Sequence, residues 1–138
     1  MVAHGTIAFD TLTTSDQVNT GTEKSLDTSY LYNGSIKAYG HHSGDSPTTA
    51  TMNDKFNVSS LADNGNGDIT YTWTNAFNNE YYSASGMSTE DGTIGYVSLY
   101  YSRSYTRSAA NLRLQGIDNG DSFDDGAFTS FMCVGALA

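Results

Sequence analysis

The chain has 138 residues, with 6 basic and 15 acidic side chains, a formal net charge of −9 and a pI near 4.3. That length suits one domain, and the scarcity of Lys and Arg argues against nucleic acid or an anionic membrane surface as a partner. The 14 Gly, 10 Tyr and single Pro favour strands and turns, and no window free of Gly and β-formers has the apolar spacing of a helix. We therefore expect an all-β fold.

Cys133 is the only cysteine, so a disulfide within the chain is impossible. A small secreted domain more often carries an even set of cysteines, and the first residues have neither the basic start nor the apolar run of a signal peptide. The sequence therefore favours assembly in a reducing cytoplasm. No window approaches the run of about 18 apolar residues that a membrane span requires.

Residues 1–34 are rich in Thr, Ser, Asp and Asn and hold too few large apolar side chains for a core of their own. Short strands are expected at Ile7–Phe9 and Tyr30–Tyr32. Three interpretations stay open: a loose arm, an arm ordered by docking on another protein, and a strand of the main sheet. We take 1–34 as an N-terminal arm and 35–138 as the β-domain.

The β-domain is expected to begin with a strand over Ser35–Tyr39, followed by a polar loop over Gly40–Asn53. This loop holds His41, His42 and Asp45. Neighbouring side chains on an extended backbone point to opposite faces, so two adjacent histidines rarely bind one ion. A solvated loop is the expected structure. The alternative is a transition metal at a symmetry axis, bound by three copies of one histidine.

The strongest turn signal is Asp63–Gly67, because its two Asn-Gly pairs accept the positive φ of tight hairpin turns. After this turn, apolar and polar residues alternate, which places one set on a single face of a strand: Ile69, Tyr71 and Trp73. Before it, a β-bulge near Ser59-Ser60 would bring Leu61 onto the face that holds Phe56 and Val58. The pattern predicts a β-hairpin.

The string Phe-Asn-Val-Ser-Ser-Leu, then Asp-Asn-Gly-Asn-Gly-Asp and alternating residues up to Trp73, resembles a domain common in tail fibres and other fibre-like virion proteins of tailed bacteriophages. In that family a stretch similar to Ile36–Tyr39 precedes the hairpin, and a segment similar to Asn79–Tyr82 follows it. The resemblance runs from about Ser35 to the C-terminus. It implies a structural virion component that forms homotrimers, with residues 1–34 attaching it to other virion proteins.

Four more strands are expected after the hairpin, over Tyr81–Gly86, Ile94–Tyr101, Asn111–Gln115 and Phe128–Val134. The second and fourth carry apolar residues on both faces, whereas a two-sheet sandwich buries one face of each strand. These strands therefore need a second cover, either from this chain or from another subunit. We expect a subunit interface, because Tyr is common at interfaces, and its candidate residues are Tyr96, Tyr100 and Phe131.

Arg and Tyr side chains interleave in the region after the Ile94–Tyr101 strand, and such a loop can bind sugars or an acidic protein surface. The candidate receptor-binding residues are Tyr101, Arg103, Tyr105 and Arg107. The alternative is a loop that serves solubility and pairs with acidic residues. The segment Asp118–Asp125 lacks the ligand spacing of an EF-hand, so we expect a solvated loop in preference to a Ca²⁺ site.

No nucleophile elbow, phosphate loop or metalloprotease motif occurs in the chain. Cys133 lies in the apolar string Phe-Met-Cys-Val, where a thiol is normally an inert core residue. We therefore expect no enzyme activity, no catalytic residues, no metal site and no cofactor.

Together these patterns predict an antiparallel β-sandwich, jelly-roll-like, of seven or eight strands with an extended N-terminal arm. The expected function is that of a homotrimeric tail fibre in a bacteriophage virion, assembled in the bacterial cytoplasm. Two alternatives are a head or neck fibre or decoration protein, and a stand-alone carbohydrate-binding β-module. Contact with a host-surface glycan and a purely structural role are both compatible with the resemblance.

Overall fold

The computed structural model describes residues 11–14, 24–43, 51–89, 96–101, 108–118 and 122–138. The chain forms two compact units, Met1–Ser35 and Ile36–Ala138. This division lies one residue beyond the boundary expected from the sequence. In the described part of the chain, no helix is long and apolar enough to cross a membrane.

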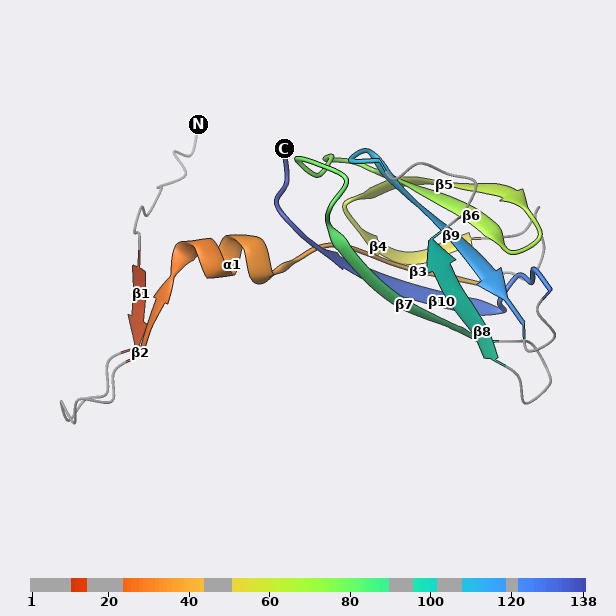
Figure 1. Ribbon diagram of the computed structural model, residues 1–138, viewed down its shortest axis with the longest axis horizontal. Helices are drawn as coiled ribbons and strands as arrows, with labels where there is room; N and C mark the ends of the chain where they lie inside the picture. The colour runs from red at the N-terminus through yellow and green to blue at the C-terminus, as the bar shows by residue number, and fades with distance from the viewer. Residues whose placement is uncertain (1–10, 15–23, 44–50, 90–95, 102–107, 119–121) are drawn as a thin grey trace, which may run out of the picture. The chain divides into compact units, whose positions relative to one another are not determined.

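The first unit contains a small antiparallel sheet and a short helix (Figure 1). β1 (Thr11–Thr14) pairs with β2 (Lys24–Asp27), and α1 spans Thr28–Gly34. The helix replaces the strand expected at Tyr30–Tyr32, because so short an alternation does not distinguish a strand from a helix. The strand expected at Ile7–Phe9 lies outside the described residues.

The second unit is an all-β antiparallel sandwich, as the sequence predicted. Its hydrogen-bonded strand order is β4-β3-β10-β7-β8-β9-β6-β5. Because β8 pairs with both β7 and β9, the ladder folds into a layer of four strands (β4, β3, β10, β7) and a layer of three (β9, β6, β5) that pack together (Figure 1). The strands are β3 (Ile36–Ser43), β4 (Thr51–Phe56), β5 (Val58–Gly65), β6 (Asp68–Trp73), β7 (Ser83–Thr89), β8 (Tyr96–Tyr101), β9 (Asn111–Ile117) and β10 (Phe128–Val134).

The predicted hairpin is confirmed and consists of β5 and β6. Gly65 and Gly67 have φ angles of 128° and 66°, as the turn signal required. The register shifts between Val58 and Ser60, where the bulge was expected. Phe56 does not belong to this hairpin, because Asn57 has a positive φ of 58° and turns the chain from β4 into β5.

Several element boundaries differ from the predictions: β7 ends at Thr89, β8 begins at Tyr96 and β9 ends at Ile117. Gly40–Ser43 continue β3, and β4 begins at Thr51, so the described residues of the loop expected over Gly40–Asn53 are strand. Its polar composition hid the strand signal, because an outward face and an edge strand can both be polar. β7 begins at Ser83 because the residues before it form a turn, in which the Asn79 Oδ1 accepts the Tyr81 amide hydrogen at 2.9 Å.

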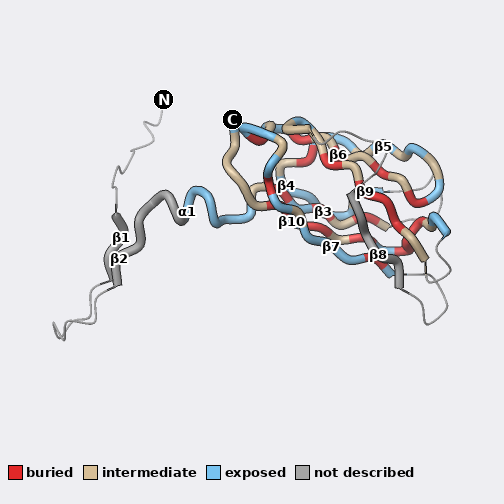
Figure 2. The backbone as a smooth tube through the Cα atoms, in the orientation of Figure 1, coloured by how far each residue is buried: buried red, intermediate tan, exposed pale blue. Residues whose placement is uncertain are grey.

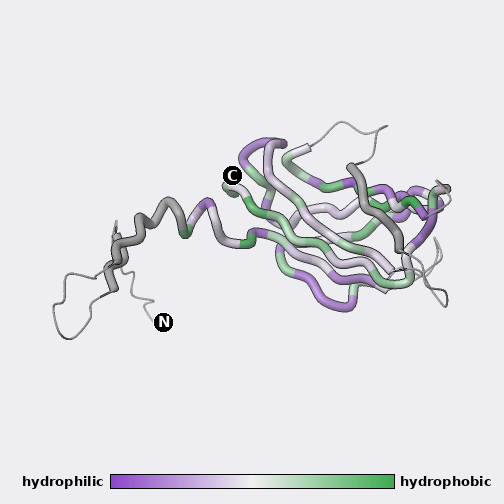
Figure 3. Tube along the Cα trace, turned by 60° about the horizontal axis from the view of Figure 1, so that its bottom comes forward, coloured by the Kyte–Doolittle hydropathy of each residue, from purple (hydrophilic) through white to green (hydrophobic). Residues whose placement is uncertain are grey.

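The core lies between the two layers and is rich in aromatic rings. Buried residues recur at alternate positions along the strands, and hydrophobic stretches follow the strands while several turns are hydrophilic (Figures 2 and 3). Trp73 and Phe77 meet edge to face with ring centroids 5.6 Å apart, and Phe77 stacks on Tyr82 at 4.3 Å. The buried core residues are Ala38, Val58, Ile69, Tyr71, Trp73, Phe77, Tyr82, Leu112, Leu114, Phe131 and Cys133.

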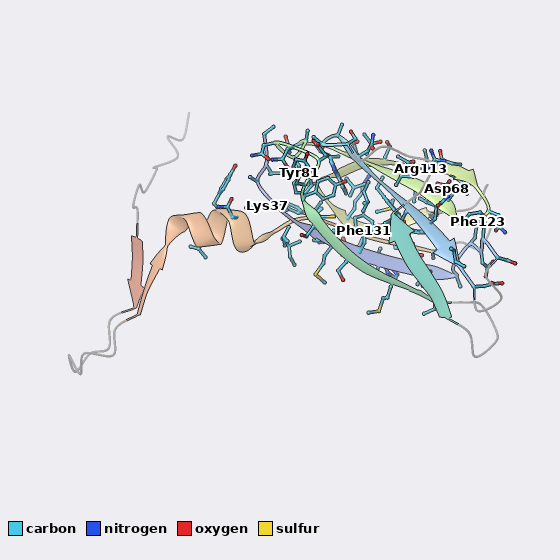
Figure 4. All side chains as sticks on the ribbon, in the orientation of Figure 1. Lys37, Asp68, Tyr81, Arg113, Phe123 and Phe131 are labelled. Atoms are coloured by element: carbon cyan, nitrogen blue, oxygen red, sulfur yellow. The ribbon has the colours of Figure 1, made fainter. Side chains whose placement is uncertain are left out.

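Phe131 lies at the centre of this core, where its ring centroid is 4.3 Å from that of Tyr71 (Figure 4). Its backbone pairs with Gly40 on β3 and Gly86 on β7, so glycine flanks it on both sides of the ladder. Only 4% of its surface is exposed within a single chain. This corrects the expectation that Phe131 lies at a subunit interface, because its side chain is already covered from within.

Phe131 and Phe128 provide a matched test of the two faces of β10. Phe131→Ala removes a buried ring, so we expect the free energy of unfolding to fall by about 3–5 kcal/mol. Phe128 is 54% exposed, and Phe128→Ala is expected to cost less than about 1 kcal/mol. Urea unfolding of dilute protein measures both values, and equal losses would contradict this assignment of the inner and outer faces.

Candidate functional site

The outward surface of the four-strand layer carries exposed large apolar side chains on all four strands. Strand alternation places them there, because Ala38, Phe131 and Cys133 on the same layer point inward. Their exposed fractions range from 37% to 72%. We call this surface the outer apolar face; its residues are Tyr39, Phe56, Met87, Phe128 and Met132.

Strand pairing arranges these five side chains around a hydrogen-bonded polar pair, Ser130 and His41, whose side chains meet at 2.7 Å. Met132 lies opposite Tyr39, and Tyr39 lies opposite Phe56, so three apolar residues form a row across β10, β3 and β4. The rings of Tyr39 and Phe56 stack with centroids 6.0 Å apart. Met87 pairs with Ser130, and is therefore the diagonal neighbour of both Phe128 and Met132 on β10.

A hollow of about 140 Å³ opens between β7 and β10 on this surface. Gly86 and Phe131, which pair across the two strands, also line the hollow. The remaining lining residues come from both strands: Ser85, Met87, Ser130 and Met132. The hollow and the apolar side chains around it make this surface the main candidate for binding.

The other predicted binding residues lie on β8 or outside the described part of the chain. Tyr96, Tyr100 and Tyr101 belong to β8, where Tyr96 pairs with Thr89 of β7 and the other two pair with β9. Arg103, Tyr105 and Arg107 lie outside the described residues. The predicted receptor site therefore stays a prediction, and the outer apolar face is a separate surface that includes none of its residues.

Comparisons of this chain with protein-family models, with curated proteins and with solved structures found no match.

A buried polar pair lies inside the sandwich at His42 and Tyr71. The two adjacent histidines of β3 point to opposite sides, as expected: His41 stacks on Phe128 outside, while His42 is 1% exposed. The Tyr71 hydroxyl and Nδ1 of His42 share a hydrogen bond at 3.0 Å, in which the tautomer of the neutral ring decides the donor. Burial of His42 corrects the expectation that both histidines lie in a solvated loop.

Burial fixes the protonation states of this pair. Desolvation lowers the pKa of His42 to about 4, with a smaller contribution in the same direction from His41, while the Asp63 carboxylate opposes it weakly. Desolvation raises the pKa of Tyr71. The imidazole is therefore neutral and the phenol protonated at pH 7. Beside them is a space of about 20 Å³, enough for one water molecule.

The acidic segment near the C-terminus fixes the hairpin turn to the rest of the sandwich. Asp125 is 7% exposed, and its Oδ1 accepts the Gly67 amide hydrogen at 2.6 Å. The Gly116 amide donates to the Gly67 carbonyl at 2.7 Å, so the turn is bound from two sides. Asp125 thus has a structural role, which corrects the expectation of a wholly solvated loop over Asp118–Asp125.

Other polar residues in the described part of the chain are also structural. Arg113 on β9 donates two hydrogen bonds to the Asp68 carboxylate on β6, at 2.6 and 2.8 Å (Figure 4). The bond from Arg113 is the main cause that lowers the pKa of Asp68. Cys133 is fully buried, and desolvation raises the pKa of its thiol to about 12. Among the described residues, no group of three His, Cys, Asp or Glu side chains is placed to hold a metal ion.

The buried histidine predicts a specific loss of stability in acid. The pKa of His42 is about 4 in the folded protein and 6.5 when unfolded, so the unfolded state takes up a proton first as the pH falls. The free energy of unfolding should therefore fall between pH 6.5 and pH 4, by up to about 3 kcal/mol. Urea unfolding at several pH values measures this slope.

Two glutamine variants separate the histidines. His42→Gln retains an acceptor for the Tyr71 hydroxyl and removes the titrating group, so its stability should change much less between pH 6.5 and pH 4. His41→Gln, its neighbour on the outward side, should retain the wild-type slope. The same slope in both variants would contradict the role of His42.

Proposed function

We propose that this chain is a fibre-like structural component of a bacteriophage virion, a tail fibre in the first instance. It assembles as a homotrimer in the bacterial cytoplasm. Residues 1–34 attach it to other virion proteins, and the β-sandwich projects from the particle. A position on the head or neck is the alternative location within the virion.

The organisation of the chain supports this proposal. The resemblance to fibre-like virion proteins begins at about Ser35, and the β-sandwich forms a separate unit that begins at Ile36. The residues that carry the resemblance build the β5–β6 hairpin, whose inward side chains are part of the core. The quoted motif therefore has a structural role here, as expected for a family whose shared residues build a domain and perform no chemistry.

The single observation that carries the proposal is the outer apolar face. This surface is at the upper end of the apolar patches that single chains expose, and such a patch often marks a site of association. The described polar clusters offer no comparable site, since His42, Asp125 and Cys133 are buried and Asp68 is paired with Arg113. A part that functions by packing into an assembly is consistent with both features.

A stand-alone carbohydrate-binding module is the second candidate, because exposed rings on a flat sheet can stack on sugars. Tyr39, Phe56 and Phe128 are such rings. However, Tyr39 and Phe56 stack on each other, and Phe128 stacks on His41, which reduces the ring surface left for a sugar. A lectin of this kind would be a stable monomer that binds glycan.

The proposal predicts that the protein is part of purified particles. Mass spectrometry of virions from the bacteriophage that encodes the chain should detect it, and antibodies should label an appendage in electron micrographs. In solution, the purified protein should have three times the 14.8 kDa mass of one chain. Its presence in the lysate together with its absence from washed particles would contradict the proposal.

A further inference from the structure

We propose that the outer apolar face is the surface through which one copy of this chain packs against a second copy. The inference deepens the proposed function and rests on its homotrimer, since it names the surface that joins the subunits. It also differs from the interface expected from the sequence. That interface was placed at Tyr96, Tyr100 and Phe131, whereas the exposed apolar residues of β10 are Phe128 and Met132.

Charge favours a second copy as the occupant. Each chain carries a formal net charge of −9, so two copies repel unless they meet where the acidic side chains are few. The described outward positions of β3, β4, β7 and β10 hold one lysine, Lys37, and one carboxylate, Asp54, so their formal charges cancel. A neutral surface on an acidic protein lets a second copy approach without strong repulsion and gives no attraction to a charged partner.

The composition of the face is also typical of the centre of an interface. Aromatic residues and Met are enriched at such centres, while Lys, Glu and Asp are depleted. The outer apolar face has three aromatic rings and two methionines, with a margin of small hydroxyl side chains that includes Ser43, Ser85 and Thr89. The polar side chains of Ser130 and His41 lie among these apolar residues and are hydrogen-bonded to each other, which makes them compatible with burial at an interface.

The size of the face suits the contact area that a stable assembly needs. Side chains of this size each bury about 200 Å², so at their observed exposures the five residues present roughly 500 Å². This lies within the upper range of apolar patches on single chains, about 300–600 Å². With the polar margin added, the surface approaches the ~800 Å² per partner of a standard interface.

The hollow between β7 and β10 gives this surface a specific feature. Its volume of about 140 Å³ is close to that of an engineered apolar cavity of ~150 Å³ that binds benzene. Gly86 and Phe131 line it, together with Met87 from β7 and Met132 from β10. An apolar side chain of the second copy fits this space, and the flexible side chains of Met87 and Met132 adapt to the side chain that enters.

Charge variants of the full-length chain test the inference by sedimentation equilibrium. Met87 is 72% and Met132 is 50% exposed, so Met87→Glu and Met132→Glu place a carboxylate at the interface without opening the core. Each should weaken self-association by about 10-fold or more. The control is Ala62→Glu, an exposed position on β5 in the other layer, which should associate like the wild type.

Three results would overturn the inference. One is a wild-type protein that has the mass of a single chain at every concentration. This is the result expected if residues 1–35 or another protein, and not a second copy, covered the face. The second is equal association of Met87→Glu, Met132→Glu and Ala62→Glu. The third is a loss of association that accompanies a loss of folding, shown by a urea midpoint well below that of Ala62→Glu in both methionine variants.

These outcomes are distinct from a failure of the virion proposal. If the wild type and both methionine variants are all trimers, the interface lies elsewhere and only the inference fails. If the protein self-associates through this face and is absent from virions, the inference stands and the proposed function fails.

Discussion

The sandwich depends on how the ring of Phe131 fills the space between its two layers. The ring packs on Tyr71 of the opposite layer, and the glycines beside it, Gly40 and Gly86, leave it room. A Cβ on Gly40 would lie 2.6 Å from an atom of this ring, which is too close for any side chain. Close packing of this kind holds β10 in one register, since a slip of one residue would exchange its two faces.

The register of β10 in turn determines what the protein presents to its surroundings. With Thr129, Phe131 and Cys133 inward, Phe128 and Met132 must point outward. Met132 lies beside Tyr39 of β3, and Met87 of β7 is the diagonal neighbour of both outward residues, so one strand contributes both to the core and to an exposed apolar face. Five exposed large apolar side chains thus lie on one layer, and this is the physical basis for the proposed role in assembly.

The sequence predicted the parts of the fold whose signals are local. The Asn-Gly pairs and the alternation up to Trp73 predicted the hairpin, and the apolar run predicted β10 with its observed bounds. It failed at His42, because a buried histidine looks like a loop residue until its partner Tyr71 is placed. It also failed at Phe131, since β10 is apolar on both faces, and the choice of the inward face depends on glycines distant in the sequence. The exposed face could be found only after that choice was known.

Oxidation of methionines by hydrogen peroxide, read by mass spectrometry, tests most directly whether this surface is covered in the assembled protein. Met87 and Met132 lie on the outer apolar face, whereas Met52 packs against the core and serves as an internal reference. In concentrated, associated protein, the oxidation rates of Met87 and Met132 divided by the rate of Met52 should be low. Dilution to single chains should raise both ratios. Equally rapid oxidation of Met87 and Met132 in the associated and the dissociated protein would contradict the account.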